Sequence, residues 1–143
     1  MRHPLHPALV HFPIACWSLA TAADLASLVW GEPVWRFAGV LLVAGIGFSI
    51  PAMLAGFLEL MKITEDSPAI KDVNRHMIVV MSALAFYTAS LLLRLHGTHL
   101  TEPGLPAIGS SVLGFLFLCA AGWLGGKLVY GHRLGVSHTP PGQ

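Results

Sequence analysis

Residues 37–61 read FAGVLLVAGIGFSIPAMLAGFLELM, an almost unbroken apolar run whose one charged residue is Glu59. An α-helix rises about 1.5 Å per residue, so about 20 residues are enough to cross a hydrocarbon core of about 30 Å. A run of this length, with no charge in its centre, is typical of a membrane-spanning helix. It therefore decides the fold class.

Three further runs have the same character, and they cover residues 8–30, 76–95 and 105–129. The composition agrees with this reading, because 55% of the 143 residues are hydrophobic, only 10% are charged and the mean hydropathy is +0.69. A soluble domain of this length is much less apolar. We predict an all-α integral membrane protein with a single domain over residues 1–143 and helices at about 8–30, 37–61, 76–95 and 105–129.

The connections between these runs are short. Gly31, Glu32 and Pro33 mark the first one, and residues 101–104 form the third. The middle connection, residues 62–75, is the most polar stretch and contains Ser67-Pro68, which indicates a turn. Short connections make successive helices antiparallel neighbours. We therefore expect an up-down-up-down bundle with both termini on the same side of the membrane.

The distribution of cations predicts the orientation. The face with both termini and the middle connection carries Arg2, Lys62, Lys71, Arg75, Lys127 and Arg133, against Arg36 and Arg94 on the other face. By the positive-inside rule both termini are cytoplasmic. The N-terminus does not resemble a cleavable signal or a transit peptide, so we expect the first helix to remain in the mature protein. The predicted location is the bacterial inner (plasma) membrane.

Two histidines enter the predicted bundle from the cytoplasmic face. His11 lies one turn inside the first run and follows Pro7, which suits the first turn of a helix, and His76 opens the third run. Ionisable side chains inside a membrane rarely face lipid and usually have a functional partner. The first and third helices of such a bundle are parallel and diagonal to each other. His11 and His76 could therefore bind one metal centre from opposite sides.

Other residues are candidates for the same site. His6 would be the ligand in place of His11 if the first helix starts earlier than residue 8. The alternative is that His6 lies in water. Glu59 could accept a hydrogen bond from a ligand imidazole or could pair with Lys62. On the fourth helix, Gly125 and Gly126 could leave room for a flat cofactor, although close helix packing is the preferred explanation of Gly122-x-x-x-Gly126 taken alone.

Several polar residues fall outside this predicted site. Asp24 lies in the outer half of the first helix, where it could be protonated, could bond to Ser49 or Tyr87, or could take part in proton or quinol chemistry. Arg94 is a possible counter-ion. His96 and His99 are too close in the chain to bind opposite sides of one iron. Cys16 and Cys119 lie deep in apolar runs and are expected to be packed free thiols.

Several motifs resemble those of a known family. They are His6-Pro-Ala-Leu-Val-His-Phe-Pro-Ile-Ala15, Asp24-Leu25, Gly56-Phe-Leu-Glu59, His76, Gly122-Trp-Leu-Gly-Gly-Lys-Leu-Val-Tyr130 and Gly135-Val136. Together they resemble the four-helix membrane proteins known as domain of unknown function 2231, over essentially the whole chain. The resemblance implies the same fold and topology, and an association with redox modules of the Rieske or cytochrome type. The family often has an aspartate where this chain has Glu59.

These observations favour a small membrane protein that binds haem b and transfers electrons to or from a quinone or a redox protein. His11 and His76 would be the axial ligands of one haem per chain. A second haem, if present, would be shared across a homodimer. The alternatives are a zinc or copper site for hydrolysis or metal handling, built from His6, His11, Glu59, His76 and His132, and a cofactor-free scaffold subunit. Membrane lipid is the surrounding partner, and no nucleic-acid partner is expected.

Overall fold

The computed structural model describes residues 5–64 and 67–132, and these are almost entirely helical. The elements in chain order are α1 (Leu5–Leu9), α2 (His11–Trp30), α3 (Glu32–Leu60), α4 (Ile70–Leu92), β1 (Leu95–His96), β2 (His99–Leu100) and α5 (Leu105–His132). Four stretches are long and apolar enough to cross a membrane, namely His6–Trp30, Glu32–Leu60, Ile70–Leu92 and Leu105–His132. The predicted all-α, four-helix membrane fold is confirmed.

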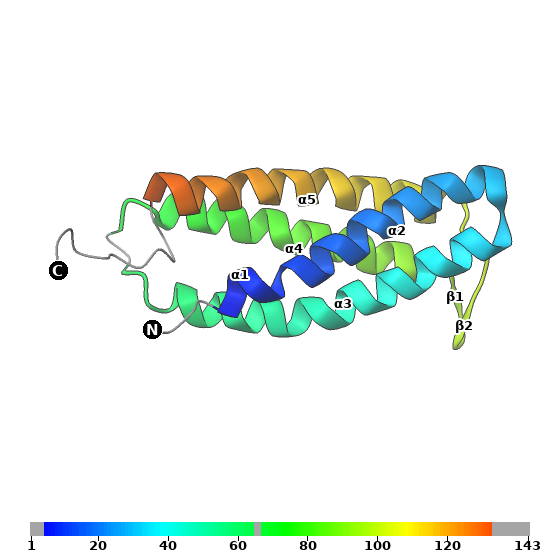
Figure 1. Cartoon of the computed structure of the whole chain (residues 1–143), viewed down its shortest axis with the longest axis horizontal. Coiled ribbons are helices and arrows are strands. Elements are labelled where there is room, and N and C mark those ends of the chain that lie inside the picture. Colours follow the sequence, from blue (N-terminus) through cyan, green and yellow to red (C-terminus); the bar gives the residue numbers. More distant parts are fainter. Residues whose placement is uncertain (1–4, 65–66, 133–143) are drawn as a thin grey trace, which may run out of the picture.

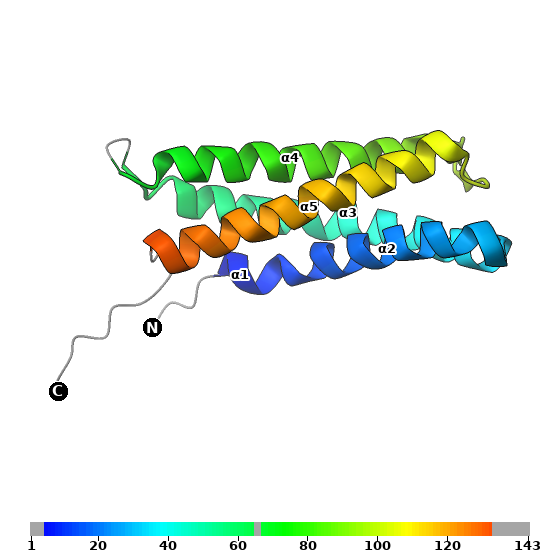
Figure 2. The same cartoon turned by 90° about the horizontal axis from the view of Figure 1, so that it is seen from above.

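The bundle consists of two helical hairpins. α2 packs along α3, and α4 packs along α5, whereas the α2–α5 and α3–α4 contacts between the hairpins are less extensive. This order of neighbours leaves α2 and α4 at diagonal corners, and successive helices are antiparallel (Figures 1 and 2). α1 begins and α5 ends at one end of the bundle, which we call the terminal end. The opposite end, where β1 and β2 lie, is the hairpin end (Figure 1).

Several helices extend beyond their apolar runs. α3 begins at Glu32 rather than at residue 37, because Gly31 ends α2 with a positive φ of 73° and Pro33 suits the first turn of the next helix. α4 begins at Ile70 rather than at residue 76, and Asp72 lies in its first turn. Hydropathy identifies the part of a helix that lies in lipid, so it misses polar turns at the ends.

A short β-hairpin, absent from the prediction, joins α4 to α5. β1 and β2 are antiparallel, with Leu95 opposite Leu100 and His96 opposite His99. The connection between them begins with Gly97, whose φ of 62° favours glycine. The hairpin is closed at its base by the Thr101 N–H, which donates to the carbonyl of Arg94 at 2.8 Å.

The core of the bundle is built around one aromatic pair. Trp17 of α2 stacks on Tyr87 of α4, with ring centroids 4.9 Å apart, and Leu42 packs beside them. Glycines make room for both rings, because a methyl group at Gly45 would overlap the indole and one at Gly114 would be 3.0 Å from the phenol ring. Many large apolar side chains point outward instead, as expected of a surface that faces lipid.

Candidate cofactor site

The N-terminal span runs from His6 to Trp30, and its first turn, α1, is separated from α2 only at Val10. Pro13 has no N–H for the carbonyl of Leu9, and its ring pushes against that carbonyl. Val10 lies between α1 and α2 with helical backbone angles, and its N–H donates to the His6 carbonyl at 3.1 Å. α1 packs against α3 with His6 half-buried, whereas His11 is exposed at the start of α2.

His6 is held against α3 by a hydrogen bond and a close contact. Its Nδ1 donates to the main-chain carbonyl of Ala52 at 2.8 Å, because a carbonyl oxygen can only accept. The ring lies on Gly56, where a Cβ atom would be 2.8 Å from Cε1 and 2.9 Å from Nδ1. A neutral ring with its proton on Nδ1 keeps a lone pair on Nε2, which is free to bind a metal.

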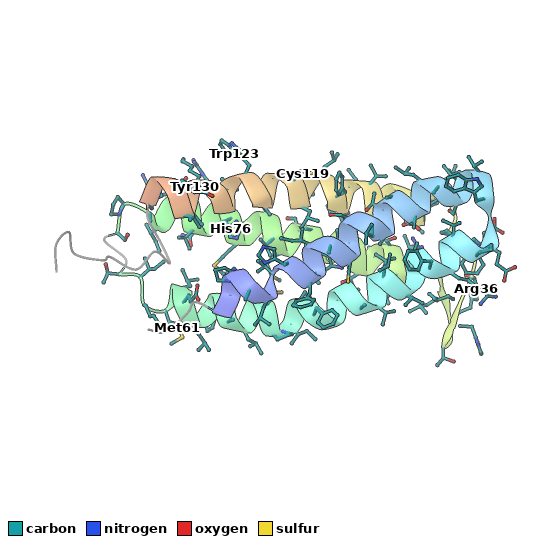
Figure 3. The ribbon with its side chains drawn as sticks, in the orientation of Figure 1. Arg36, Met61, His76, Cys119, Trp123 and Tyr130 are labelled. Atoms are coloured by element: carbon teal, nitrogen blue, oxygen red, sulfur yellow. The ribbon has the colours of Figure 1, made fainter. Side chains whose placement is uncertain are left out.

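His76 is half-buried in the second turn of α4. Its Nδ1 is buried and has no hydrogen-bond partner within the described part of the chain. A Cβ atom at Gly125 would be 3.4 Å from Cε1 of His76, so the imidazole lies beside the main chain of α5 at this glycine. Figure 3 shows His76 toward the terminal end, together with Met61 and Tyr130.

The structure places His6 and His76 half-buried on different hairpins toward the terminal end, and it places His11 on the exposed surface. Of the two predicted glycines, Gly125 contacts the site. A Cβ atom at Gly126 or Gly122 would meet nothing within 4 Å, so these two glycines do not pack against another described helix of this chain.

Glu59 lies one turn after Gly56, on the side of α3 that His6 contacts, and is half-buried. Its carboxylate forms no ion pair with any residue that the structure describes. Lys62 approaches it only through the main chain, with an N–H that donates to the Glu59 carbonyl at 3.2 Å. The carboxylate is therefore free of the predicted partner Lys62.

Asp24 and Arg94 form a buried ion pair that joins the two hairpins. The guanidinium donates from both terminal nitrogens to the two carboxylate oxygens, at 2.7 and 2.9 Å. Its Nε also donates to the Ser90 carbonyl at 3.1 Å, and the Ser90 hydroxyl donates to the Ala107 carbonyl at 2.7 Å. Of the candidate partners of Asp24, the structure therefore identifies Arg94. The hydroxyl of Ser49 donates to the main-chain carbonyl of Ile46 instead.

A group of hydroxyls forms a second link between the hairpins. Thr21 Oγ1 lies 3.0 Å from the Tyr87 hydroxyl and 3.0 Å from the Ser111 hydroxyl. This group connects α2 with α4 and α5 in the middle of the bundle. Among residues 5–64 and 67–132, no hydrogen bond or ion pair joins the two hairpins nearer the terminal end, where His6 and His76 lie.

Sequence reasoning missed a cluster of charges at the terminal end. Asp72 Oδ2 lies 3.0 Å from Lys127 Nζ and 3.0 Å from His132 Nε2, and Asp72 Oδ1 lies 3.7 Å from an Arg75 nitrogen. We name these four residues the Asp72 cluster. Arg75 could have been found from its i, i+3 spacing on α4. Lys127 and His132 come from α5, and only the packing of the hairpin brings them to Asp72.

The remaining polar candidates lie apart from the two imidazoles. His96 and His99 are exposed on β1 and β2. Cys16 and Cys119 are free thiols, half-buried and exposed, respectively. Within the described residues there is no group of three or more His, Cys, Asp or Glu side chains arranged to hold a metal ion.

Comparison with known proteins identifies the family. The family model described as "Predicted membrane protein (DUF2231)" matches residues 2–138. The chain therefore belongs to this family of predicted membrane proteins, and the family resemblance of its motifs is confirmed. No curated protein and no solved structure matches the chain.

Proposed function

We propose that this member of the family binds one haem b between His6 and His76 and exchanges electrons with a quinone or a redox protein. One observation carries the proposal: two half-buried imidazoles lie toward the same end of the bundle, one on α1 and one on α4, and each lies on a glycine. A bound haem supplies one-electron chemistry at its iron, at a potential set by its ligands and surroundings.

The residues present fit such a group. His6 has its Nδ1 fixed by a main-chain carbonyl, which is the usual way of orienting a metal-binding imidazole. The His76 ring is half-buried, and no side chain bonds to its buried Nδ1 among the described residues. Gly56 and Gly125 leave space where other residues would place a side chain.

The packing of the two hairpins also supports a flat ligand at this end. Polar links hold the hairpins together through Asp24 with Arg94 and through Thr21 with Tyr87. Nearer the terminal end the described hairpins meet only through apolar contacts. This part of their interface can separate to admit a plate without breaking a hydrogen bond between them.

The structure gives a reason to prefer His6 to His11 as the first ligand. α1 starts at Leu5, so the first helical segment begins earlier than residue 8, and His6 is turned toward α3. His11 is exposed. We assign Glu59 to the surroundings of the site, where a carboxylate near an imidazole raises the basicity of the ring and lowers the reduction potential of the iron.

We also propose that the terminal end is cytoplasmic and that the membrane is the bacterial inner membrane. Arg94 contributes nothing to the charge of the hairpin end, because Asp24 neutralises it in the interior. Arg36 is exposed there and is paired with Glu32 at 2.7 Å. Lys62, Lys71, Arg75 and Lys127 lie at the terminal end, in accordance with the positive-inside rule.

The test is an absorption spectrum of the detergent-purified protein, oxidised and then reduced with dithionite, with elemental analysis of the same sample. We expect a Soret band, sharp bands on reduction and about one iron per chain. A colourless protein with stoichiometric zinc or copper would replace this proposal with a metal site. A protein without any metal would replace it with a scaffold role.

Four single substitutions identify the ligands. His6→Ala and His76→Ala should each abolish or strongly reduce haem retention, whereas His11→Ala should retain it. His96→Ala is the control, because His96 is exposed at the hairpin end. Loss of haem in His11→Ala together with retention in His6→Ala would restore His11 as the ligand.

A further inference from the structure

We propose that the Asp72 cluster, together with Trp123 and Tyr130, binds the headgroup of an anionic phospholipid. The proposal does not depend on haem. It concerns the outer surface of the α4–α5 hairpin at the terminal end, where cations gather around one carboxylate and exposed aromatic rings lie beside them.

The first observation is an excess of positive charge. Asp72 is the one carboxylate within 4.0 Å of the permanently charged groups of Lys127 and Arg75 among the described residues, and His132 binds the same carboxylate. One negative charge cannot neutralise two cations. The side chains of Lys127 and Arg75 are 45% and 69% exposed, whereas Asp72 is 11% exposed, so the surplus charge faces outward.

The hairpin end offers a contrast. Arg36 is paired with Glu32 alone, and Arg94 is paired with Asp24 alone. In the described structure each of these cations has one carboxylate, whereas at the Asp72 cluster two permanent cations share a carboxylate. An anion that binds at the Asp72 cluster would supply a second negative charge, so that the two permanent cations would be matched by two anionic groups.

The second observation places the cluster at a membrane interface. Trp123, Lys127 and Tyr130 follow one another at i, i+4 and i+7, so they share one face of α5. Trp123 is 71% exposed and Tyr130 is 87% exposed, and Figure 3 shows Trp123 on the outer side of α5. Such aromatic rings gather at the level of lipid headgroups.

Together these features select a lipid rather than a soluble anion. A phosphate group beside Lys127 and Arg75 would receive charge-assisted hydrogen bonds. The acyl chains below it would cover the surface between Trp123 and Gly126, where a Cβ atom at Gly126 would meet nothing within 4 Å. A free phosphate ion has no apolar part that would use this surface. Basic sites between transmembrane helices bind anionic headgroups for the same reason.

The experiment titrates the detergent-purified full chain with phosphatidylglycerol and counts bound lipids by native mass spectrometry. Phosphatidylcholine and inorganic phosphate are titrated separately. We expect preferential binding of phosphatidylglycerol, and a loss of about fivefold in affinity in each of Lys127→Gln and Arg75→Gln, as expected for one cation near an anionic headgroup. Asp72→Asn should bind phosphatidylglycerol more tightly, because it frees both cations. Arg36→Gln is the control and should bind as the parent protein does.

The variants also separate charge from folding. Lys127→Arg keeps the cation and should keep the affinity, and Arg75→Gln alters a mostly exposed side chain. Equal binding of phosphatidylglycerol by the parent, Lys127→Gln and Arg75→Gln would overturn the proposal. Equal affinity for phosphatidylcholine would do the same. Displacement of the lipid by millimolar inorganic phosphate would assign the cluster to a free anion instead.

Discussion

Arg94 and Asp24 face each other across the two hairpins as a bidentate ion pair, and neither side chain is exposed. The charge of each one is compensated only by the other within the described chain, while Ser90 satisfies further donors of the guanidinium. A pair of this kind ties α2 to the end of α4, which fixes how the two hairpins are aligned.

Breaking this pair should be costly. Asp24→Ala or Arg94→Ala leaves one uncompensated charge in the interior, so each should lower the free energy of unfolding by about 3–5 kcal/mol. The double variant Asp24→Leu/Arg94→Met should recover much of that loss, since it removes both charges. Unfolding in mixed detergent measures these values.

The exposed pair Glu32–Arg36 is the matched control for this prediction. Its single alanine variants should change stability by about 0–1 kcal/mol. If substitutions in the buried and exposed pairs lowered the free energy of unfolding equally, the buried pair would not be what holds the two hairpins together.

The hydroxyl of Tyr87 should contribute modestly, and its ring much more. Tyr87→Phe removes the contact with Thr21 at 3.0 Å but keeps the stacking on Trp17, so it should cost about 0.6 kcal/mol and at most about 1.7 kcal/mol. Tyr87→Ala loses the ring contacts and should cost about 3–5 kcal/mol. Equal losses in both variants, measured by the same unfolding assay, would contradict this division.

Gly56→Ala should displace His6. The added Cβ atom would lie 2.8 Å from Cε1 of the ring, so the imidazole would have to leave the Ala52 carbonyl. We expect loss of the Soret absorbance with the bundle still folded. Gly47→Ala is the control on the same helix, because its Cβ atom would meet nothing within 4 Å. Full haem retention in Gly56→Ala would show that His6 is not a ligand in its present position.

Glu59→Gln should raise the reduction potential of the bound haem. The substitution removes a negative charge one turn from Gly56. The oxidised iron carries one more positive charge than the reduced iron, so the loss of this negative charge disfavours the oxidised state. A redox titration followed by absorbance measures the change. Glu32→Gln, at the hairpin end beside Arg36, should leave the potential unchanged. Equal shifts in both variants would remove Glu59 from the surroundings of the site.

The sequence was sufficient for the spans but not for their ends. Four apolar runs identified four helices, because the length of an apolar run reports directly on the thickness of the bilayer. The polar first turn of α4 at Asp72 and the β-hairpin around Gly97 were missed, since neither lies in lipid and hydropathy carries no signal for them.

The candidate site was only partly predictable. The sequence indicated that histidines near the ends of the first and third spans deserve attention, and it named His6 as the substitute for His11. It could not choose between them, because the choice depends on the way in which α1 packs against α3.

By itself the sequence determined that this chain is a four-helix membrane protein, because hydrophobic length and short connections suffice for that. The tertiary structure alone decided which groups meet: Asp24 with Arg94, Asp72 with Lys127, and His6 with the main-chain carbonyl of Ala52. The physical reason is the solvent. In a bilayer both the lipid-facing and the interior faces of a helix are apolar, so the periodicity that reveals the buried face of a soluble helix is weak here, and packing alone selects the contacts.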